Sequence, residues 1–346
     1  MMPLPVLEKA AAQMLNYEGS GMSVMEMSHR SKYYDDIING AQDVLRRVLN
    51  IPDNYKILFM QGGATMQFSA IPLNLMVTGK ADYAITGNFA RNAAKEARKF
   101  GTVQIAATSE ADNFTWIPTQ DQLNLDPTAD YFYFCANNTI FGTEWHYDPE
   151  TGNVPLVADM SSNILSKPVD VSKYGLIYAG AQKNMGPAGM AVVIIREDLM
   201  GHYRENMPVL LDYALTSSKN SMYNTPPTYS IYMMKLVAEW VEEMGGVEAM
   251  AKLADKRSSM LYDYLDSSKL FQGAAQKESR SRMNVTFRTG DEELDKKFIK
   301  ESIEAGMSNL KGHRLVGGMR ASIYNAMPVE GVEYLIDFMQ KFEKNN

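Results

Sequence analysis

The sequence contains few of the residues that build disulfides and metal centres. Its 346 residues include one cysteine, Cys135, and four histidines. A single cysteine excludes a disulfide within the chain and a cysteine-rich metal site, so no metal is expected. Cys135 lies in the apolar run 131–136, which predicts a buried thiol. These features favour a protein of the reducing cytoplasm.

Long apolar and basic stretches are also missing. No uninterrupted apolar segment approaches membrane-spanning length, and the first residues lack the basic-then-apolar order of an export signal. We therefore expect a soluble, cytoplasmic protein. The net charge is -7, and no run of lysine and arginine could displace counterions from a nucleic acid. A general nucleic-acid binder is excluded, and any phosphate ligand needs a local site.

Short apolar runs alternate with helical patterns and predict an α/β fold. The runs are apolar throughout, as expected of strands that helices cover on both faces. Seven strands are predicted, at 56–60, 81–86, 103–107, 131–136, 155–160, 174–181 and 190–195. Helices are predicted at 35–49, 66–77 and 88–100. Pro72 should kink the second helix. The last run follows too closely on Ala181 for a helical crossover, so we expect an antiparallel pair within a mixed, mostly parallel sheet.

A smaller domain is predicted to begin at Gly245. The helical pattern at 228–244 ends there, and a helix, a strand at 283–288, a helix, a strand at 319–324 and a last helix follow. This order indicates a separate α+β unit. We predict a large domain over residues 1–244 and a small C-terminal domain over residues 245–346.

Lys183 is the candidate that organises the chemistry. It follows the predicted strand 174–181, and Gly186 and Pro187 then turn the chain into the next strand. A partly desolvated lysine loses preference for its charged form, so more of it is the free amine that condenses with an aldehyde. By spacing alone, a lysine of a surface loop is the favoured interpretation of Lys183, and other residues have to support the chemical one.

Asp159 ends the strand 155–160, so it can emerge at the same sheet edge as Lys183. A carboxylate there suits the protonated ring nitrogen of pyridoxal phosphate, because it keeps the ring able to accept electrons. The alternative is a helix N-cap, a position that aspartate also favours.

A glycine pair, Gly62 and Gly63, precedes Ala64 and Thr65 between a strand and a helix. Backbone N–H groups at such a helix start can bind a phosphate. The segment is neither a dinucleotide fingerprint nor a P-loop, and a glycine pair here could be only a turn.

Two histidine–arginine pairs suggest that anions are bound. They are His29–Arg30 and His313–Arg314, and Arg320 stands nearby in a predicted strand preceded by glycines. Three guanidinium groups suit a substrate with two anionic ends. Ordinary surface charge is the alternative for each pair.

Four strings in this order resemble the phosphoserine aminotransferase family, a branch of the class V aminotransferases. They are residues 21–30 (GMSVMEMSHR), 179–184 (AGAQKN), 223–227 (YNTPP) and 312–328, which runs from GHR to NAMP. The resemblance covers nearly the whole chain. It implies a fold-type-I pyridoxal phosphate enzyme, a homodimer that moves the amino group of L-glutamate to 3-phosphohydroxypyruvate. The products are O-phospho-L-serine and 2-oxoglutarate, in serine biosynthesis. Some members also act in pyridoxine biosynthesis, which the sequence leaves open.

The resemblance also implies roles for single residues. Lys183 bonds the cofactor aldehyde, Asp159 pairs with the ring nitrogen, and Thr139 bonds near the ring hydroxyl. The resemblance implies that the cofactor phosphate is bound by Ala64, Thr65 and Gln182. It also implies that Asn224 and Thr225 reach this phosphate from the neighbouring subunit. Arg320 would take the α-carboxylate. The distal carboxylate or phosphate would lie among His29, Arg30, His313 and Arg314.

The chain departs from the family's pattern in three places. Phe89 stands where the family usually has a tryptophan stacked on the cofactor, so we expect weaker stacking. Ala64 and Thr65 replace a longer side chain or glycine in the phosphate loop. The family's short N-terminal segment is missing before Leu4, and we expect weaker substrate binding if that loss is real.

Other functions stay open at this point. They are an aminotransferase for another acidic 2-oxo acid or an aminophosphonate, and a non-catalytic pyridoxal phosphate carrier. A cysteine desulfurase is disfavoured because Cys135 lies in a strand, and a nicotinamide-dependent dehydrogenase because the glycine fingerprint is missing.

Overall fold

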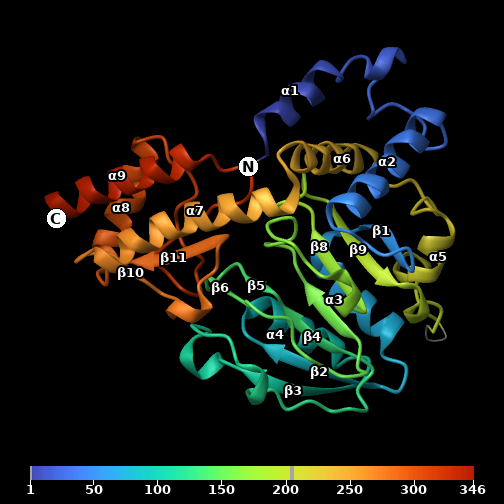
Figure 1. The fold of residues 1–346 in the computed structure, drawn as a ribbon, viewed down its shortest axis with the longest axis horizontal. Helices are drawn as coiled ribbons and strands as arrows, with labels where there is room; N and C mark the ends of the chain where they lie inside the picture. Colours follow the sequence, from blue (N-terminus) through green and yellow to red (C-terminus); the bar gives the residue numbers. More distant parts are fainter. Residues whose placement is uncertain (1, 203–205) are drawn as a thin grey trace.

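The computed structural model describes residues 2–202 and 206–346, and Figure 1 shows their arrangement. Within these ranges, seven strands form one sheet in the order β1-β9-β8-β7-β4-β2-β3. The strands are β1 (Tyr55–Gln61), β2 (Lys80–Ile85), β3 (Thr102–Thr108), β4 (Phe132–Cys135), β7 (Leu156–Asp159), β8 (Leu176–Gly180) and β9 (Met190–Arg196). All seven strands predicted from the apolar runs are confirmed.

The direction of the strands decides which loops meet. β9 is antiparallel to both β1 and β8, as the short connection to β9 predicted, and the remaining pairs in the sheet are parallel. Because β1 and β8 are both antiparallel to β9, they run in the same direction. The carboxyl ends of β1, β8, β7, β4 and β2 therefore lie along one edge of the sheet.

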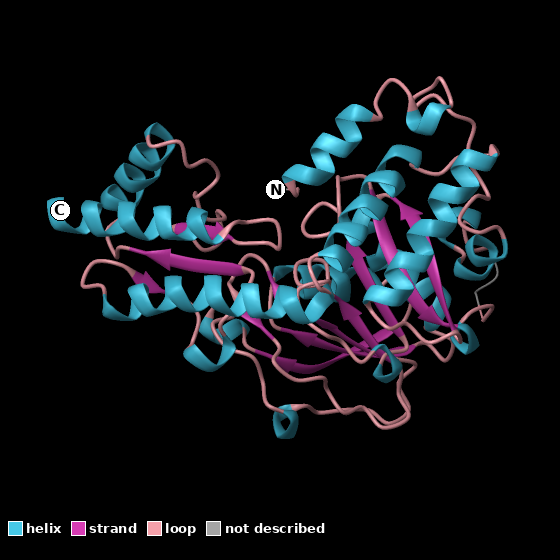
Figure 2. Ribbon diagram, turned by 45° about the horizontal axis from the view of Figure 1, so that its top comes forward, coloured by secondary structure: helices cyan, strands magenta, loops and turns pink. Residues whose placement is uncertain are grey.

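Helices cover both faces of this sheet (Figure 2). The helices of this region are α1 (Leu4–Ala12), α2 (Lys32–Val48), α3 (Gly63–Leu75), α4 (Asn88–Ala97), α5 (Tyr213–Ser218) and α6 (Thr228–Glu243). Alternate residues of β1 enter two cores: Ile57 and Phe59 pack with α2 and α6, whereas Leu58 and Met60 pack with α3 and α4. Burial on both faces explains why the strands are apolar throughout, and the α/β prediction is confirmed. α3 contains Pro72 and continues to Leu75, and the kink stays a prediction.

The C-terminal part has a sheet and a core of its own. Its elements are α7 (Gly246–Ser267), β10 (Gln272–Gly273), β11 (Asn284–Arg288), α8 (Glu292–Glu304), β12 (Met319–Ser322) and α9 (Val329–Asn345). The order β10-β11-β12 is antiparallel, and residues such as Phe271 and Phe298 form a separate core. Val247 and Met250, in the first turns of α7, pack instead in the core of the large sheet. The boundary at Gly245 stays a prediction that the separate sheet and core support.

Among the described residues, no helix combines the length and apolarity needed to cross a bilayer.

Candidate active site

Segments that follow co-directional strands line a cavity of about 290 Å³ at the carboxyl edge of the sheet. Its lining comes from the turn after β1, the start of α4 after β2, the end of β7 and the loop after β8. The main lining residues are Gly62, Gly63, Ala64, Thr65, Phe89, Asp159, Ser161, Gln182 and Lys183. The loops at such an edge are where ligands bind in open α/β sheets. The strand directions thus bring together residues as far apart in the sequence as Gly62 and Lys183.

Lys183 lies in the loop after β8 and its side chain is partly buried. Its Nζ donates a hydrogen bond to Thr139 Oγ1 at 2.8 Å and lies 4.9 Å from the centre of the Phe89 ring. Burial lowers the pKa of the Lys183 amine, and the nearby Asp159 opposes that shift. The lysine is therefore not a solvated loop residue, and its lowered pKa favours the free amine.

Asp159 is the last residue of β7 and is 4% exposed. Its Oδ1 accepts hydrogen bonds from the Ser161 backbone N–H at 2.9 Å and from Ser161 Oγ at 2.5 Å. Its Oδ2 accepts the Tyr178 hydroxyl at 3.0 Å. No α-helix starts within 160–167, so Asp159 is not a helix N-cap, and the carboxylate lines the cavity. A buried carboxylate with three fixed donors suits a ligand that presents a cation.

The glycine pair after β1 forms the N-terminus of α3. Gly62 is the N-cap with φ +85°, and Gly63 follows with φ +66°, a backbone conformation that side chains disfavour. The first N–H groups of a helix have no partner within it and lie at the positive end of its dipole. Ala64 and Thr65 belong to this first turn. The turn can therefore accept an anion in the cavity that Lys183 also lines.

The C-terminal part reaches this site through Arg320 on β12. Arg320 Nη1 donates to the Thr139 carbonyl at 3.2 Å, and Thr139 is the partner of Lys183. Burial lowers the pKa of His313, and so do the charges of Arg320 and Arg314. These three residues therefore form an electropositive group that an anion would stabilise.

Eight predicted site residues are not among those that line the cavity: Thr139, His313, Arg314 and Arg320, described above, and Asn224, Thr225, His29 and Arg30. Asn224 and Thr225 are exposed, and the Thr225 carbonyl accepts a hydrogen bond from Gln61 Nε2 at 2.8 Å. His29 and Arg30 lie in the segment before α2. The resemblance places Asn224 and Thr225 at the partner's cofactor phosphate, and places some of the two histidine–arginine pairs across the interface.

The sequence reasoning missed the residues that hold Asp159. Tyr178 lies in the predicted strand 174–181 and Ser161 directly follows the predicted strand 155–160, but serine and tyrosine at such positions carry no chemical signal by themselves. Only the pairing of β7 with β8, which sets Asp159 opposite Tyr178, shows their contact.

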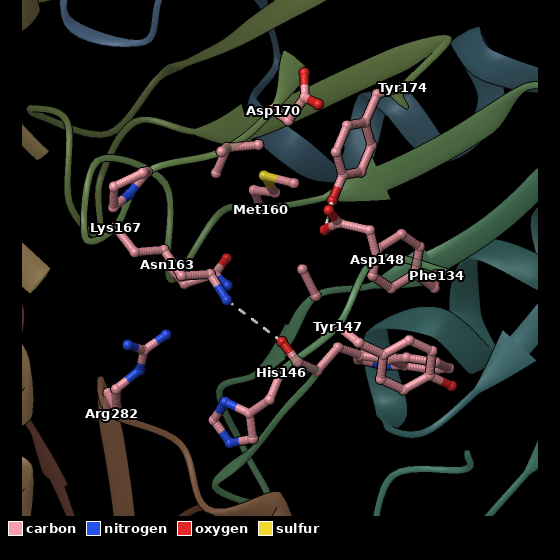
Figure 3. Close-up of a pocket in the computed structure, with 14 residues that line it drawn as sticks. Phe134, His146, Tyr147, Asp148, Met160, Asn163, Lys167, Asp170, Tyr174 and Arg282 are labelled. Atoms are coloured by element: carbon pink, nitrogen blue, oxygen red, sulfur yellow. Dashed lines mark hydrogen bonds between the residues drawn. The ribbon is translucent and has the colours of Figure 1, made fainter. Parts of the chain in front are cut away.

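A second cavity, of about 260 Å³, lies between the loops after β4 and β7 and the C-terminal part (Figure 3). Lys167 reaches across it, and its Nζ donates to the Trp145 carbonyl at 3.4 Å. Glu144, which is fully buried, pairs with Lys167 at 3.1 Å and with Arg282 at 3.3 Å. The charges are therefore already paired, and they join the two parts of the chain. In the described ranges, no cluster of histidine, cysteine and acidic residues is placed to hold a metal ion.

Comparison with known proteins identifies the class that this fold and site define. The model of the aminotransferase class-V family matches residues 1–335, so the chain belongs to this family of pyridoxal-phosphate-dependent transaminases.

Within that family, the relatives are phosphoserine aminotransferases. The one from Bacillus cereus is 54% identical over 347 residues, covering 100% of this chain and 96% of the relative. The structure of the one from Bacillus circulans subsp. alkalophilus has a TM-score of 0.98 at 46% identity and covers 100% and 96% of the two chains. The pyridoxal-phosphate-bound one from Trichomonas vaginalis has a TM-score of 0.94 at 40% identity and covers 98% and 97%. The chain belongs with the phosphoserine aminotransferases.

Proposed function

We propose that the protein transfers the amino group between L-glutamate and 3-phosphohydroxypyruvate, giving O-phospho-L-serine and 2-oxoglutarate in serine biosynthesis. The cavity holds pyridoxal phosphate. The observation that carries the proposal is one cavity lined by a desolvated lysine, a buried carboxylate and the start of a helix, in a chain related along its whole length to phosphoserine aminotransferases.

The residues present fit the cofactor. Lys183 supplies the amine for the aldehyde, Asp159 the anion for the ring nitrogen, and Phe89 a ring to stack on. The turn Ala64–Thr65, with Gln182, suits the phosphate. When bound, pyridoxal phosphate takes up the substrate amine and withdraws electrons from the α-carbon.

Lys183 has two tasks in this mechanism. Its amine would hold the cofactor at rest, and as the free amine it would carry a proton to and from the substrate α-carbon. A lowered pKa suits this second task, because a base must be free of its proton at the working pH. Thr139, which bonds Nζ, orients the amine.

Substrate anions are bound by the electropositive group at the C-terminal part. Arg320 suits the α-carboxylate, because a guanidinium binds a carboxylate through two parallel hydrogen bonds. His313 and Arg314 suit the distal carboxylate of glutamate or the phosphate of the other substrate. We place His29 and Arg30 at the same distal group, from one subunit or the other.

A homodimer completes the site in this proposal. Val209, Leu210 and Tyr223 are about half exposed and line one hollow with Asn224. Apolar side chains gathered on a surface indicate a protein partner. We infer that this face meets the second subunit, so that Asn224 and Thr225 reach the partner's cofactor phosphate.

The decisive experiment mixes cofactor-loaded protein with glutamate and 3-phosphohydroxypyruvate, and detects phosphoserine by mass spectrometry. Other acidic 2-oxo acids and phosphonate analogues compete as amino acceptors in parallel. We expect phosphoserine as the preferred product. Conversion of the cofactor by glutamate without phosphoserine would overturn the choice of substrate and leave an aminotransferase.

A further inference from the structure

Buried hydroxyl groups connect Asp159 to the core beneath α3 and α4. The Tyr178 hydroxyl donates to Asp159 Oδ2 at 3.0 Å, and the Tyr133 hydroxyl lies 2.7 Å from that of Tyr178. Tyr178 is 0% and Tyr133 1% exposed, and they lie on strands β8 and β4, which flank β7 in the sheet. Water therefore does not compete for these bonds.

The direction of the hydrogen bonds follows from the number of protons. A carboxylate only accepts, so the single hydroxyl proton of Tyr178 is given to Asp159. Tyr133 must then donate its proton to the Tyr178 oxygen. Burial raises the pKa of both phenols well above the ordinary value, and the charge of Asp159 raises both further. Both tyrosines keep their protons wherever the enzyme works.

The other oxygen of Asp159 is held as firmly. Ser161 donates to Oδ1 through its backbone N–H and its hydroxyl, and the Ser161 hydroxyl accepts from the Gly180 N–H at 2.9 Å. With one oxygen fixed by Ser161 and the other by Tyr178, the carboxylate cannot rotate. Its remaining acceptor capacity points to the cavity that it lines.

We propose that Tyr178, supported by Tyr133, is a positioning residue that holds Asp159 against the cofactor's ring nitrogen. The inference rests on the proposed function. A fixed carboxylate keeps positive charge at that nitrogen, whereas a mobile one shares its charge with other donors. In a buried site of low polarity, a hydrogen bond of this kind is strong, and its neighbours reinforce it.

The same core contains a matched control. The Tyr83 and Tyr131 hydroxyls form a second buried pair at 2.8 Å, and no hydrogen bond joins that pair to Asp159 among the described residues. Tyr178→Phe leaves the Tyr133 hydroxyl without its partner, and Tyr131→Phe does the same to Tyr83. The structural cost of the two changes is therefore comparable, and only the first touches Asp159.

The experiment compares wild type, Tyr178→Phe, Tyr133→Phe and Tyr131→Phe as cofactor-loaded enzymes. In Tyr178→Phe we expect kcat for phosphoserine formation to fall roughly tenfold or more, with KM for glutamate within about twofold. A spectroscopic readout is independent of turnover. The pH midpoint of the cofactor's visible absorbance change should move upward, because the ring carries less positive charge. Tyr133→Phe should lower kcat and raise the pH midpoint by smaller amounts than Tyr178→Phe does. Tyr131→Phe should match the wild type in both quantities.

Equal kcat and equal spectral midpoints in Tyr178→Phe and Tyr131→Phe would overturn the inference. Failure of the wild-type protein to make phosphoserine would instead overturn the proposed function, so the two failures are distinct.

Discussion

The chemical task that we propose for Lys183 comes with a cost in stability. Burial lowers the pKa of its amine, which means that the folded chain disfavours the charge that the unfolded chain carries. The same desolvation supplies the free amine for chemistry. Function and stability are therefore opposed at this residue.

We expect Lys183→Met and Lys183→Arg to abolish transamination. Methionine has no amine, and arginine stays protonated. The free energy of unfolding of cofactor-free Lys183→Met should equal or exceed that of the wild type, because no amine is buried. Product formation and denaturant unfolding test the two parts. Measurable turnover in either variant would remove Lys183 from the mechanism.

At the scale of elements, the turn between β1 and α3 gives two glycines different constraints. A Cβ on Gly62 would lie 3.0 Å from the Met66 side chain, whereas a Cβ on Gly63 would meet nothing within 4 Å. Both have positive φ. Substitution at Gly63 therefore tests backbone conformation and the approach of an anion without a clash inside the protein.

Gly63→Ala should lower the free energy of unfolding by about 1 kcal/mol because of its left-handed backbone, and should also weaken binding of pyridoxal phosphate. Gly290→Ala is the control, since Gly290 has φ +86° and open space on an exposed turn. It should cost similar stability and leave cofactor affinity unchanged. Denaturant unfolding and a cofactor titration separate the effects. Equal affinity in both variants would argue against a phosphate at this turn.

At the scale of the whole molecule, a buried ion cluster joins the two parts of the chain. Burial opposes ionisation of Glu144, but Lys167 and Arg282 outweigh it and lower its pKa from 4.5 to about 2. Arg282 lies just before β11, in the C-terminal part. The Arg282 backbone N–H also donates to Glu144, at 3.1 Å.

Arg282→Met should lower the free energy of unfolding by about 3–5 kcal/mol, because it leaves Glu144 with less compensation for burial. The control is Arg47→Met, which breaks an exposed pair with Glu242 and should cost less than about 1 kcal/mol. Chemical denaturation measures both. Similar losses would show that the buried cluster contributes no more than a surface pair.

The pH dependence of stability follows from the same cluster. Because the folded pKa of Glu144 lies below its ordinary value, its stabilisation is present above pH 4.5 and is lost as pH falls towards about 2. Glu144→Gln should flatten this part of the stability profile. If Glu144→Gln loses as much stability as the wild type when the pH falls from 4.5 towards about 2, other carboxylates cause that loss.

Subunit complementation tests whether the site is shared between two subunits, as we propose. We expect Lys183→Ala and the double variant Asn224→Ala, Thr225→Ala each to be inactive or weakened alone. Mixed dimers refolded together should recover activity, because one of their two sites has every residue intact. Absence of recovery, with mixed dimers shown by native mass spectrometry, would contradict the contribution from the partner.

The site was predictable in part, for physical reasons. Lys183, Asp159 and the glycine turn were predicted because each combines an unusual residue type with the end of a strand. Their meeting in one cavity needed the strand order, and β1 lies beside β9 rather than β2. Tyr178 and the Glu144–Arg282 pair were missed, because only pairing across the sheet or between the two parts shows them. Ser161 lies two residues after Asp159 and was missed because a serine at a strand end carries no chemical signal by itself.

The sequence by itself determined the α/β class and the strands, because burial on both faces demands runs that are apolar throughout. It also supplied the amine, the carboxylate and the glycines, whose chemistry depends on residue type. Tertiary structure alone decided that β1 and β8 run in the same direction, which places the anion site beside Lys183. It also decided that the Tyr178 hydroxyl holds Asp159, because a hydrogen bond between distant residues depends on distances that the order of residues does not contain.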